Sequence, residues 1–475
     1  MRVLIVLIAA GLAASCTLGP NYKRPVVQTP ATYRGAEPGA DGASLADTKW
    51  FDLFRDPALT QLVTSALRQN FDVRIAAERV LQARAALRIT RADQFPSIGG
   101  SAAVADSRVS RAGASGAIPS GAKTEVSYTE LGFTLDWELD VWGRLRRLTE
   151  SARAQYFATE EARHGVETTL VADVTQTYLA LRALDLELAI ARRTRDVATD
   201  SLRLTNSRRE RGVANALDVR QSEQLLHIAG AQIAGLERDV AQTENALSLL
   251  LGQVPGDIPR GLELEAFRVP PAVPAGLPSE LLERRPDIRQ AEQELIAANA
   301  QIGAARAEYF PRISLTGVLG VQSRALSSLL TGPAGFWTAS VGAVAPIFNA
   351  GRTSANVRLA ESVQRELVVN YQRSIYTALR EVSDSLAGYR KTSEQRTEQE
   401  RLVEALREAS RLSAERYQAG VDNYLQVLDA QRNLFQGELD LARLRQQELS
   451  SLVQLYRALG GGWDPAASVA SGLGM

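Results

Sequence analysis

Cysteine and histidine are nearly absent from this sequence of 475 residues, which contains only Cys16, His164 and His227. Zinc and iron sites are usually built from several Cys and His ligands, so this scarcity argues against a metal centre. It also removes the side chains needed for a Cys nucleophile or a Ser-His-Asp triad. The sequence has no Walker-type loop and no strand followed by a G-x-G-x-x-G turn. We therefore expect no enzyme activity, no metal and no cofactor.

Net charge and long apolar runs are lacking as well. The 54 basic and 54 acidic side chains cancel, and no Lys/Arg run offers a track for phosphates, so nucleic acid is not an expected partner. No uninterrupted apolar run is long enough for a transmembrane helix. Any membrane-spanning part of this chain is therefore expected to be made of β-strands.

The N-terminus has the pattern of a processing signal. Arg2 precedes an apolar run at residues 3–10, and small residues then lead to Cys16. Residues 1–15 are predicted to be a signal peptide. The site resembles a bacterial lipobox, although Ala13 stands where Leu is more usual. This resemblance implies that Cys16 is lipidated and becomes the first mature residue, and Thr17 in place of Asp implies the outer membrane.

A strand with two different faces is predicted at residues 129–141. Side chains on a strand alternate between faces, so one face here is apolar and the other is acidic. The apolar face consists of Leu131, Phe133, Leu135, Trp137, Leu139 and Val141. The acidic face includes Glu130, Asp136, Glu138 and Asp140. Such a strand fits either a soluble sheet that covers a core or a membrane barrel with a polar lumen.

Most of the remaining chain is predicted to be helical and duplicated. Phe95-Pro96 recurs as Phe310-Pro311, and Gly212-Val213 recurs as Gly420-Val421. The resulting organisation is an extended N-terminal segment (16–56), repeat 1 (57–252), a proline-rich linker (253–286), repeat 2 (287–463) and a tail (464–475). Each repeat is read as a helix, a β-hairpin (about 97–142 and about 312–349), a long helix and a returning helix.

The predicted helices are too long for a compact domain. Helical pattern runs from Pro57 to Asp93, and a second region could run unbroken from Arg144 to Arg211, roughly 100 Å at 1.5 Å per residue. Their apolar stripes need partners, and four strands cannot close a barrel. The strands of several copies must therefore close together. Two copies would give eight strands and three would give twelve, and the residues alone leave both open.

Several motifs together resemble the outer-membrane factors of tripartite efflux systems, the TolC/OprM family, and its lipoprotein branch in particular. The motifs are Cys16 with GPNY at 19–22, WFDLFRDPAL at 50–59, the segment RRPDIRQAEQEL within 284–315, YQAGVDNYLQVLDAQR at 417–432 and LYRALGGGW at 455–463. The resemblance implies a mainly α protein with membrane β: a homotrimer whose 12-stranded β-barrel continues into a long periplasmic α-helical barrel.

The resemblance also implies function and partners. The family acts as a passive exit duct in the outer membrane for small molecules. An inner-membrane RND-type pump delivers them through a periplasmic adaptor protein. Outer-membrane lipid would surround the barrel and hold the lipid anchor. Two alternatives remain: the duct of a type I protein or peptide secretion system, and a lipid-anchored coiled-coil scaffold that does not conduct.

In that family, polar links and an acidic constriction close the periplasmic end of the duct, which we call the gate. By resemblance, the gate positions are Tyr417, Asp422, Leu425 and Asp429 of repeat 2 and Asp218 of repeat 1. Leu425 and Asp429 are four residues apart and face the same way on a helix. Two other interpretations are that Asp422 and Asn423 cap the following helix and that Asp429 is a solvated surface charge. The acidic strand face would line the barrel lumen and favour cations.

Overall fold

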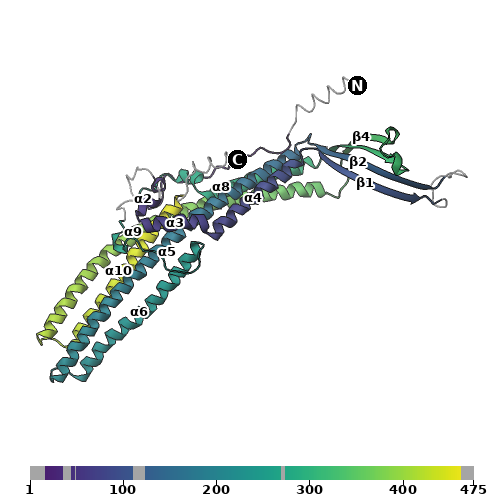
Figure 1. Ribbon diagram of the computed structural model, residues 1–475. Helices are drawn as coiled ribbons and strands as arrows, with labels where there is room; N and C mark the ends of the chain where they lie inside the picture. Colours follow the sequence, from purple (N-terminus) through teal and green to yellow (C-terminus); the bar gives the residue numbers. More distant parts are fainter. Residues whose placement is uncertain (1–16, 36–43, 49, 111–122, 269–272, 462–475) are drawn as a thin grey trace. The chain divides into compact units, whose positions relative to one another are not determined.

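The computed structural model describes residues 17–35, 44–48, 50–110, 123–268 and 273–461 (Figure 1). The signal peptide at 1–15, Cys16 and the tail at 464–475 lie outside these residues. The chain forms two compact units. Unit 1 comprises residues 1–25, 80–159 and 291–371, and unit 2 comprises 26–79, 160–290 and 372–475. Each unit therefore contains segments of both sequence repeats.

Unit 1 contains the four predicted strands in one antiparallel sheet with the order β1-β2-β3-β4. The first hairpin consists of β1 (Ser97–Arg108) and β2 (Glu125–Leu139). The second consists of β3 (Arg312–Ser323) and β4 (Gly335–Val344). Pairing of β2 with β3 joins the hairpins of the two repeats, so the duplication produces a single sheet.

The register places the apolar residues of neighbouring strands on one face of this sheet. Phe133 lies opposite Leu319, which in turn lies opposite Trp337, and directly opposed residues of an antiparallel pair share a face. These three side chains are 64%, 63% and 75% exposed. A continuous apolar surface of this kind requires a membrane or a partner to cover it.

Unit 1 also holds the start of the described chain in place. The Arg147 guanidinium donates hydrogen bonds to the carbonyl oxygens of Leu18 at 3.0 Å and Gly19 at 3.3 Å. Arg24 forms a two-bond ion pair with Glu292 at 2.6 and 2.7 Å. Residues 17–35 contain no helix or strand, in line with the predicted extended segment, and these contacts fasten them to the helices. The prediction of an extended chain over 16–56 is wrong at residues 50–54, which form a short helix.

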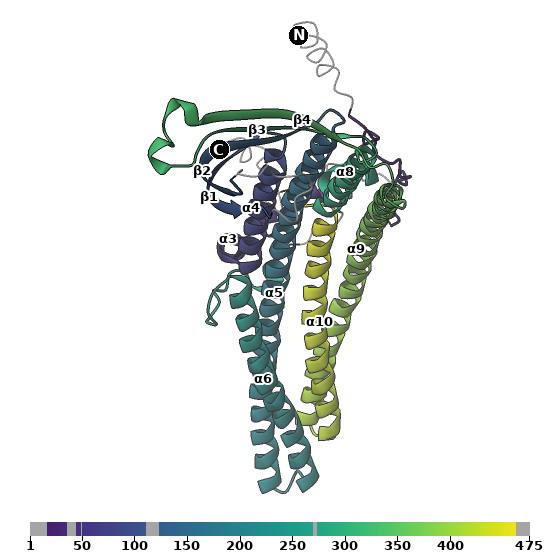
Figure 2. The ribbon, with the colours of Figure 1, turned by 90° about the vertical axis from the view of Figure 1, so that its right-hand side faces the viewer.

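Unit 2 is dominated by four long helices in two antiparallel pairs (Figure 2). The first pair is α5 (Arg144–Glu210), whose N-terminal part belongs to unit 1, with α6 (Ala216–Leu250). The second pair is α9 (Arg352–Gln418), which likewise begins in unit 1, with α10 (Tyr424–Ala458). Each turn needs a left-handed residue, and Gly212 (φ +75°) and Gly420 (φ +76°) supply it without steric cost.

Shorter helices complete the fold: α2 (Trp50–Phe54), α3 (Pro57–Gln69), α4 (Phe71–Ala92), α7 (Leu281–Arg284) and α8 (Pro286–Ala307). The expectation of one helical region from Pro57 to Asp93 is wrong at Asn70. The Asn70 side chain accepts hydrogen bonds from the amides of Asp72 and Val73 and donates to the Leu250 carbonyl at 2.9 Å. Asn70 therefore ends α3 and caps α4. Within the described residues, no helix combines the length and hydropathy needed to cross a membrane.

Candidate functional site

The predicted gate residues lie at the ends of the two long helix pairs. The turns 211–215 and 419–423 are found at the same end of unit 2 in Figures 1 and 2. Both turns are built alike. A glycine ends the incoming helix, and Asn215 or Asn423 caps the outgoing one through hydrogen bonds to the amides of Asp218 at 2.9 Å and Gln426 at 3.4 Å. The duplicated sequence thus produces two matching helix tips.

Tyr417 is buried inside the tip. Its ring packs edge-on against Tyr424 with centroids 5.4 Å apart, and the Arg208 guanidinium lies 4.5 Å from its centroid. Arg208 also donates to the Tyr417 carbonyl at 3.3 Å. These contacts join the end of α5 to the end of α9 through a cation–π interaction and a hydrogen bond. The structure therefore places Tyr417 where it holds the two tips together.

Both tyrosines belong to an apolar cluster, which we call the tip cluster. It consists of Ala198, Leu225, Tyr417, Tyr424, Val427 and Leu428, with Leu226 packed against it. The Tyr424 hydroxyl lies 3.1 Å from the Ser201 hydroxyl of α5. Sequence reasoning missed Arg208 and Ser201, because nothing in their local sequence indicates contact with residues more than two hundred positions away.

Asp422, in the turn 419–423, forms an ion pair with Arg416 at the end of α9. Arg416 contacts its two carboxylate oxygens at 2.6 and 3.1 Å. The hydrogen bonds from Arg416 lower the pKa of Asp422 below its ordinary value. Asn423, rather than Asp422, caps α10. Asp422 therefore stabilises the turn between α9 and α10 and is already paired within this chain.

Leu425 and Asp429 lie one turn apart on α10, and both side chains are exposed. The contact recorded for Asp429 is a long hydrogen bond of 3.4 Å from Asn433 on the same helix. Asp218 differs, because its carboxylate accepts from the Asn215 amide at 3.0 Å in a reciprocal capping box. Of the three, Leu425 and Asp429 have the exposure that residues of a constriction require.

The predicted acidic face of the sheet is smaller than its sequence indicates. Asp140 lies just beyond β2, and its inclusion in the strand was wrong: it accepts from the amides of Leu145 and Arg146 at 3.0 and 2.8 Å, which satisfies the first turn of α5. Glu138 forms a two-bond pair with Arg144 at 3.0 and 2.8 Å.

The other two acidic residues remain on the open part of the sheet. Glu130 accepts one bond from Gln322 at 3.2 Å, and Asp136 is exposed. Exposed carboxylates keep their charge available to a lumen. The acidic character of this face therefore rests mainly on Glu130 and Asp136.

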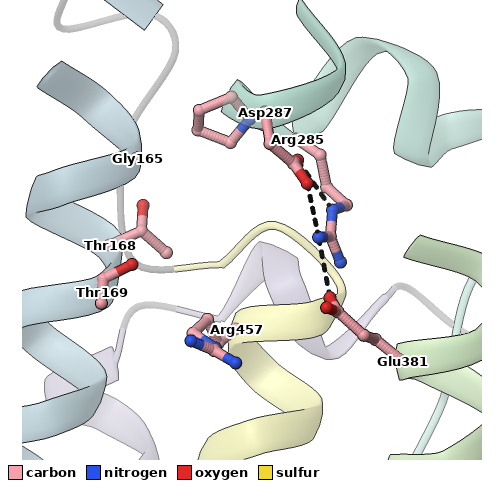
Figure 3. Close-up of a pocket in the computed structure, with 8 residues that line it drawn as sticks. Gly165, Thr168, Thr169, Arg285, Asp287, Glu381 and Arg457 are labelled. Atoms are coloured by element: carbon pink, nitrogen blue, oxygen red, sulfur yellow. Dashed lines mark hydrogen bonds and ion pairs between the residues drawn. The ribbon is translucent and has the colours of Figure 1, made fainter. Parts of the chain in front are cut away.

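A cavity of about 240 Å³ lies at the start of α8 in unit 2 (Figure 3). The buried Arg285 guanidinium bridges Asp287 and Glu381, each at 2.8 Å, and donates to the Ala458 carbonyl at 3.0 Å. Burial acts to lower the pKa of Arg285, but Asp287 and Glu381 outweigh it and the net pKa is raised. Arg285 thus serves to fasten α8 to α9 and α10. Within the described residues, no group of three or more His, Cys, Asp or Glu is placed to hold a metal ion.

Comparison with known proteins assigns most of the chain to a family of outer membrane efflux proteins. The family model described as "Outer membrane efflux protein" matches residues 62–253 and 277–461, one match in each repeat. The solvent efflux pump outer membrane protein SrpC of Pseudomonas putida is 40% identical over 95% of this chain and 97% of its own length. The probable outer membrane lipoprotein SilC of Salmonella typhimurium is 36% identical over 95% of this chain and 96% of its own length.

Similarity to a solved channel structure supports the same family. The open state of the MtrE outer membrane channel of Neisseria gonorrhoeae superposes with a TM-score of 0.85 at 31% identity, and covers 94% of this chain and 98% of that one. The similarity therefore extends over nearly the whole chain. Together, these matches show that the chain belongs to the outer membrane efflux protein family.

Proposed function

We propose that this protein is the lipid-anchored exit duct of a tripartite efflux system. Three copies would close their sheets into a 12-stranded barrel in the outer membrane, and their long helices would form a tube through the periplasm. A periplasmic adaptor would connect this tube to an RND-type pump of the inner membrane. Small toxic compounds are the proposed cargo, and the name of the relative SrpC supports organic solvents among them.

The observation that carries the proposal is the four-stranded sheet. Its apolar face is exposed, and the strand order leaves the outer edges of β1 and β4 unpaired within the described residues. Unpaired backbone groups are not tolerated in lipid, so the sheet has to close with other copies. Three sheets of four strands give a barrel wide enough for an open lumen.

We assign the gate residues two roles within this duct. In a three-fold assembly, Leu425 and Asp429 would each form a ring that narrows the pore, and the Asp429 ring would repel anions. Tyr417, Asp422 and Asp218 would maintain the shape of the tips. The contacts that support these second roles are the Arg208–Tyr417 stack, the Arg416–Asp422 pair and the Asn215–Asp218 capping box.

Deleting the gene in its own host tests the transport function. We expect greater sensitivity to organic solvents and apolar antibiotics, and recovery when the wild-type gene is restored. Unchanged sensitivity after deletion, with the neighbouring pump and adaptor genes expressed, would count against an efflux role. The anchor is tested separately by the intact mass of the mature protein: an added diacylglyceryl group lost in Cys16→Ser supports it, and an unmodified wild-type mass refutes it.

A further inference from the structure

Glu438 of α10 is a buried carboxylate held by arginines of two other helices. Its side chain lies 2.5 Å from Arg193 of α5 and 3.1 Å from Arg407 of α9. The Glu438 side chain is 10% exposed, whereas the two arginine side chains are 60% and 64% exposed. The carboxylate is therefore withdrawn from water and depends on both arginines, while each arginine remains partly solvated. This residue connects three helices at one level.

Two further contacts fix α10 near this level. Gln399 of α9 donates to the Gly437 carbonyl at 3.0 Å, and a Cβ at Gly437 would lie 2.8 Å from the Leu406 side chain. The absence of a side chain at Gly437 therefore allows α9 to approach α10 closely. Glu187 of α5 also accepts from Arg443 of α10 at 3.0 Å. Two ion pairs therefore join α5 to α10. In Arg193–Glu438 the cation lies on α5, and in Arg443–Glu187 it lies on α10.

The packing of α10 changes between Glu438 and the tip. Around Glu438, Phe435 on its tip side and Leu439 and Ala442 beyond it pack with residues of α5 and α6 in an apolar cluster. Nearer the tip, Val427 and Leu428 belong to the tip cluster. Between them lies a cavity of about 310 Å³, to which all four long helices contribute. Its lining includes Val197, Leu225, Arg407, Ser410, Gln431 and Glu438. This space opens to the surface and separates the two apolar clusters.

We propose that Glu438 is a positioning residue for the gate. Bound by Arg193 and Arg407, it fixes α10 at the boundary of the cavity, and the segment that carries Leu425 and Asp429 moves about this point. Asp429 precedes Glu438 by nine residues, about 13 Å along a helix. A small rotation at Glu438 is therefore enough to displace Asp429. The cavity gives the part of α10 on the tip side of Phe435 room to move, while Leu439 and Ala442 stay packed beyond Glu438. This inference rests on the gate assigned above.

Single-channel conductance of the purified full-length protein in planar bilayers tests the inference. Glu438→Gln keeps the shape of the side chain but removes the charge that both arginines bind, so we expect a severalfold higher conductance. Glu438→Asp keeps the charge, and the flexible arginines can follow it, so conductance is expected near the wild-type value. Arg407→Gln removes one of the two arginines and should give a smaller increase. Glu408→Gln is the matched control, because exposed Glu408 pairs with Arg411 on its own helix.

Wild-type conductance of Glu438→Gln would overturn the inference, as would equal increases in Glu438→Gln and Glu438→Asp, which would indicate packing rather than charge. Where Glu438→Gln fails to assemble, Arg407→Gln decides: an unchanged conductance refutes the positioning role. Asp429→Ala is recorded in parallel to separate the two proposals. A higher conductance in Asp429→Ala but not in Glu438→Gln supports the proposed gate and refutes the positioning role of Glu438. The reverse result supports Glu438 and removes Asp429 from the constriction.

Discussion

Asp429 and Leu425 are the residues on which the proposed constriction depends. Their spacing of four residues in a helical sequence was sufficient to predict a shared face, and the structure leaves both side chains exposed on α10. The same tip turned out to be stabilised by Arg208, Ser201 and Arg416. The sequence could not reveal the roles of Arg208 and Ser201, because their partners lie more than two hundred residues away in the chain. Helical periodicity carries no information about contacts between residues so far apart in sequence.

Asp429→Ala is expected to raise single-channel conductance severalfold and to weaken cation preference, because it would remove a carboxylate from each subunit at the proposed constriction. Trimer assembly should be unaffected, since the side chain is exposed and bonds only weakly to Asn433. Recordings in planar bilayers check this, with Asp440→Asn as a control of the same charge change on the same helix. Unchanged conductance in Asp429→Ala would remove it from the gate.

Tyr178 is a buried residue with a predicted effect on stability. Its hydroxyl donates to Asp56 at 2.9 Å and accepts from the Gly261 amide at 2.8 Å. Tyr178→Phe leaves both groups short of a partner and should cost about 1–3 kcal/mol of unfolding free energy. Thermal or denaturant unfolding of the purified protein measures this. Exposed Tyr309 serves as the control, and an equal loss in Tyr309→Phe would contradict the role of the hydrogen bonds.

The same tyrosine predicts a pH effect. Burial, together with Asp56, raises the pKa of Tyr178 from 10.0 to about 12, although the bond from Gly261 acts in the opposite direction. Above pH 10 the unfolded chain loses the phenolic proton while the folded chain retains it, so stability falls as pH rises towards 12. Tyr178→Phe should flatten this alkaline loss. An unchanged slope would show that Tyr178 does not contribute to it.

Among the elements, the long helices were the easiest to predict. The helix predicted from Arg144 to Arg211 matches α5 to within one residue, and the repeated glycines Gly212 and Gly420 lie just after the ends of α5 and α9. The break at Asn70 was missed because apolar periodicity continues across it. The Asn70 side chain explains the break, because it caps α4 locally and also bonds to the Leu250 carbonyl. The short helix α2 was also missed, since residues 50–54 carry too little pattern to indicate a helix.

The strands allow a prediction about ion selectivity. The expected alternation is present, but Arg144 and Arg146 neutralise Glu138 and Asp140, so Glu130 and Asp136 carry the acidic face. Reversal potentials in a salt gradient should therefore show a modest preference for cations. Glu130→Gln with Asp136→Asn should reduce it further than Glu138→Gln does. Anion preference of the wild-type channel would contradict a lumen lined by this face.

At the scale of the whole molecule, the duplication and the mainly helical fold with four strands were predictable from the sequence and are confirmed. Membership of the outer membrane efflux protein family confirms the predicted role as an efflux channel of the outer membrane. The number of copies could not be derived from one chain, because both eight and twelve strands satisfy the edges of β1 and β4. The number of copies depends on the contacts between neighbouring copies, and the sequence of one chain does not define these contacts.

The molar mass of the detergent-purified protein, measured by light scattering during size-exclusion chromatography, tests the central claim most directly. The exposed apolar sheet and the unpaired edge strands require association, so we predict a single species with three times the mass of the mature chain after correction for detergent. A monodisperse single subunit, stable in detergent with its hairpins intact, would contradict the account.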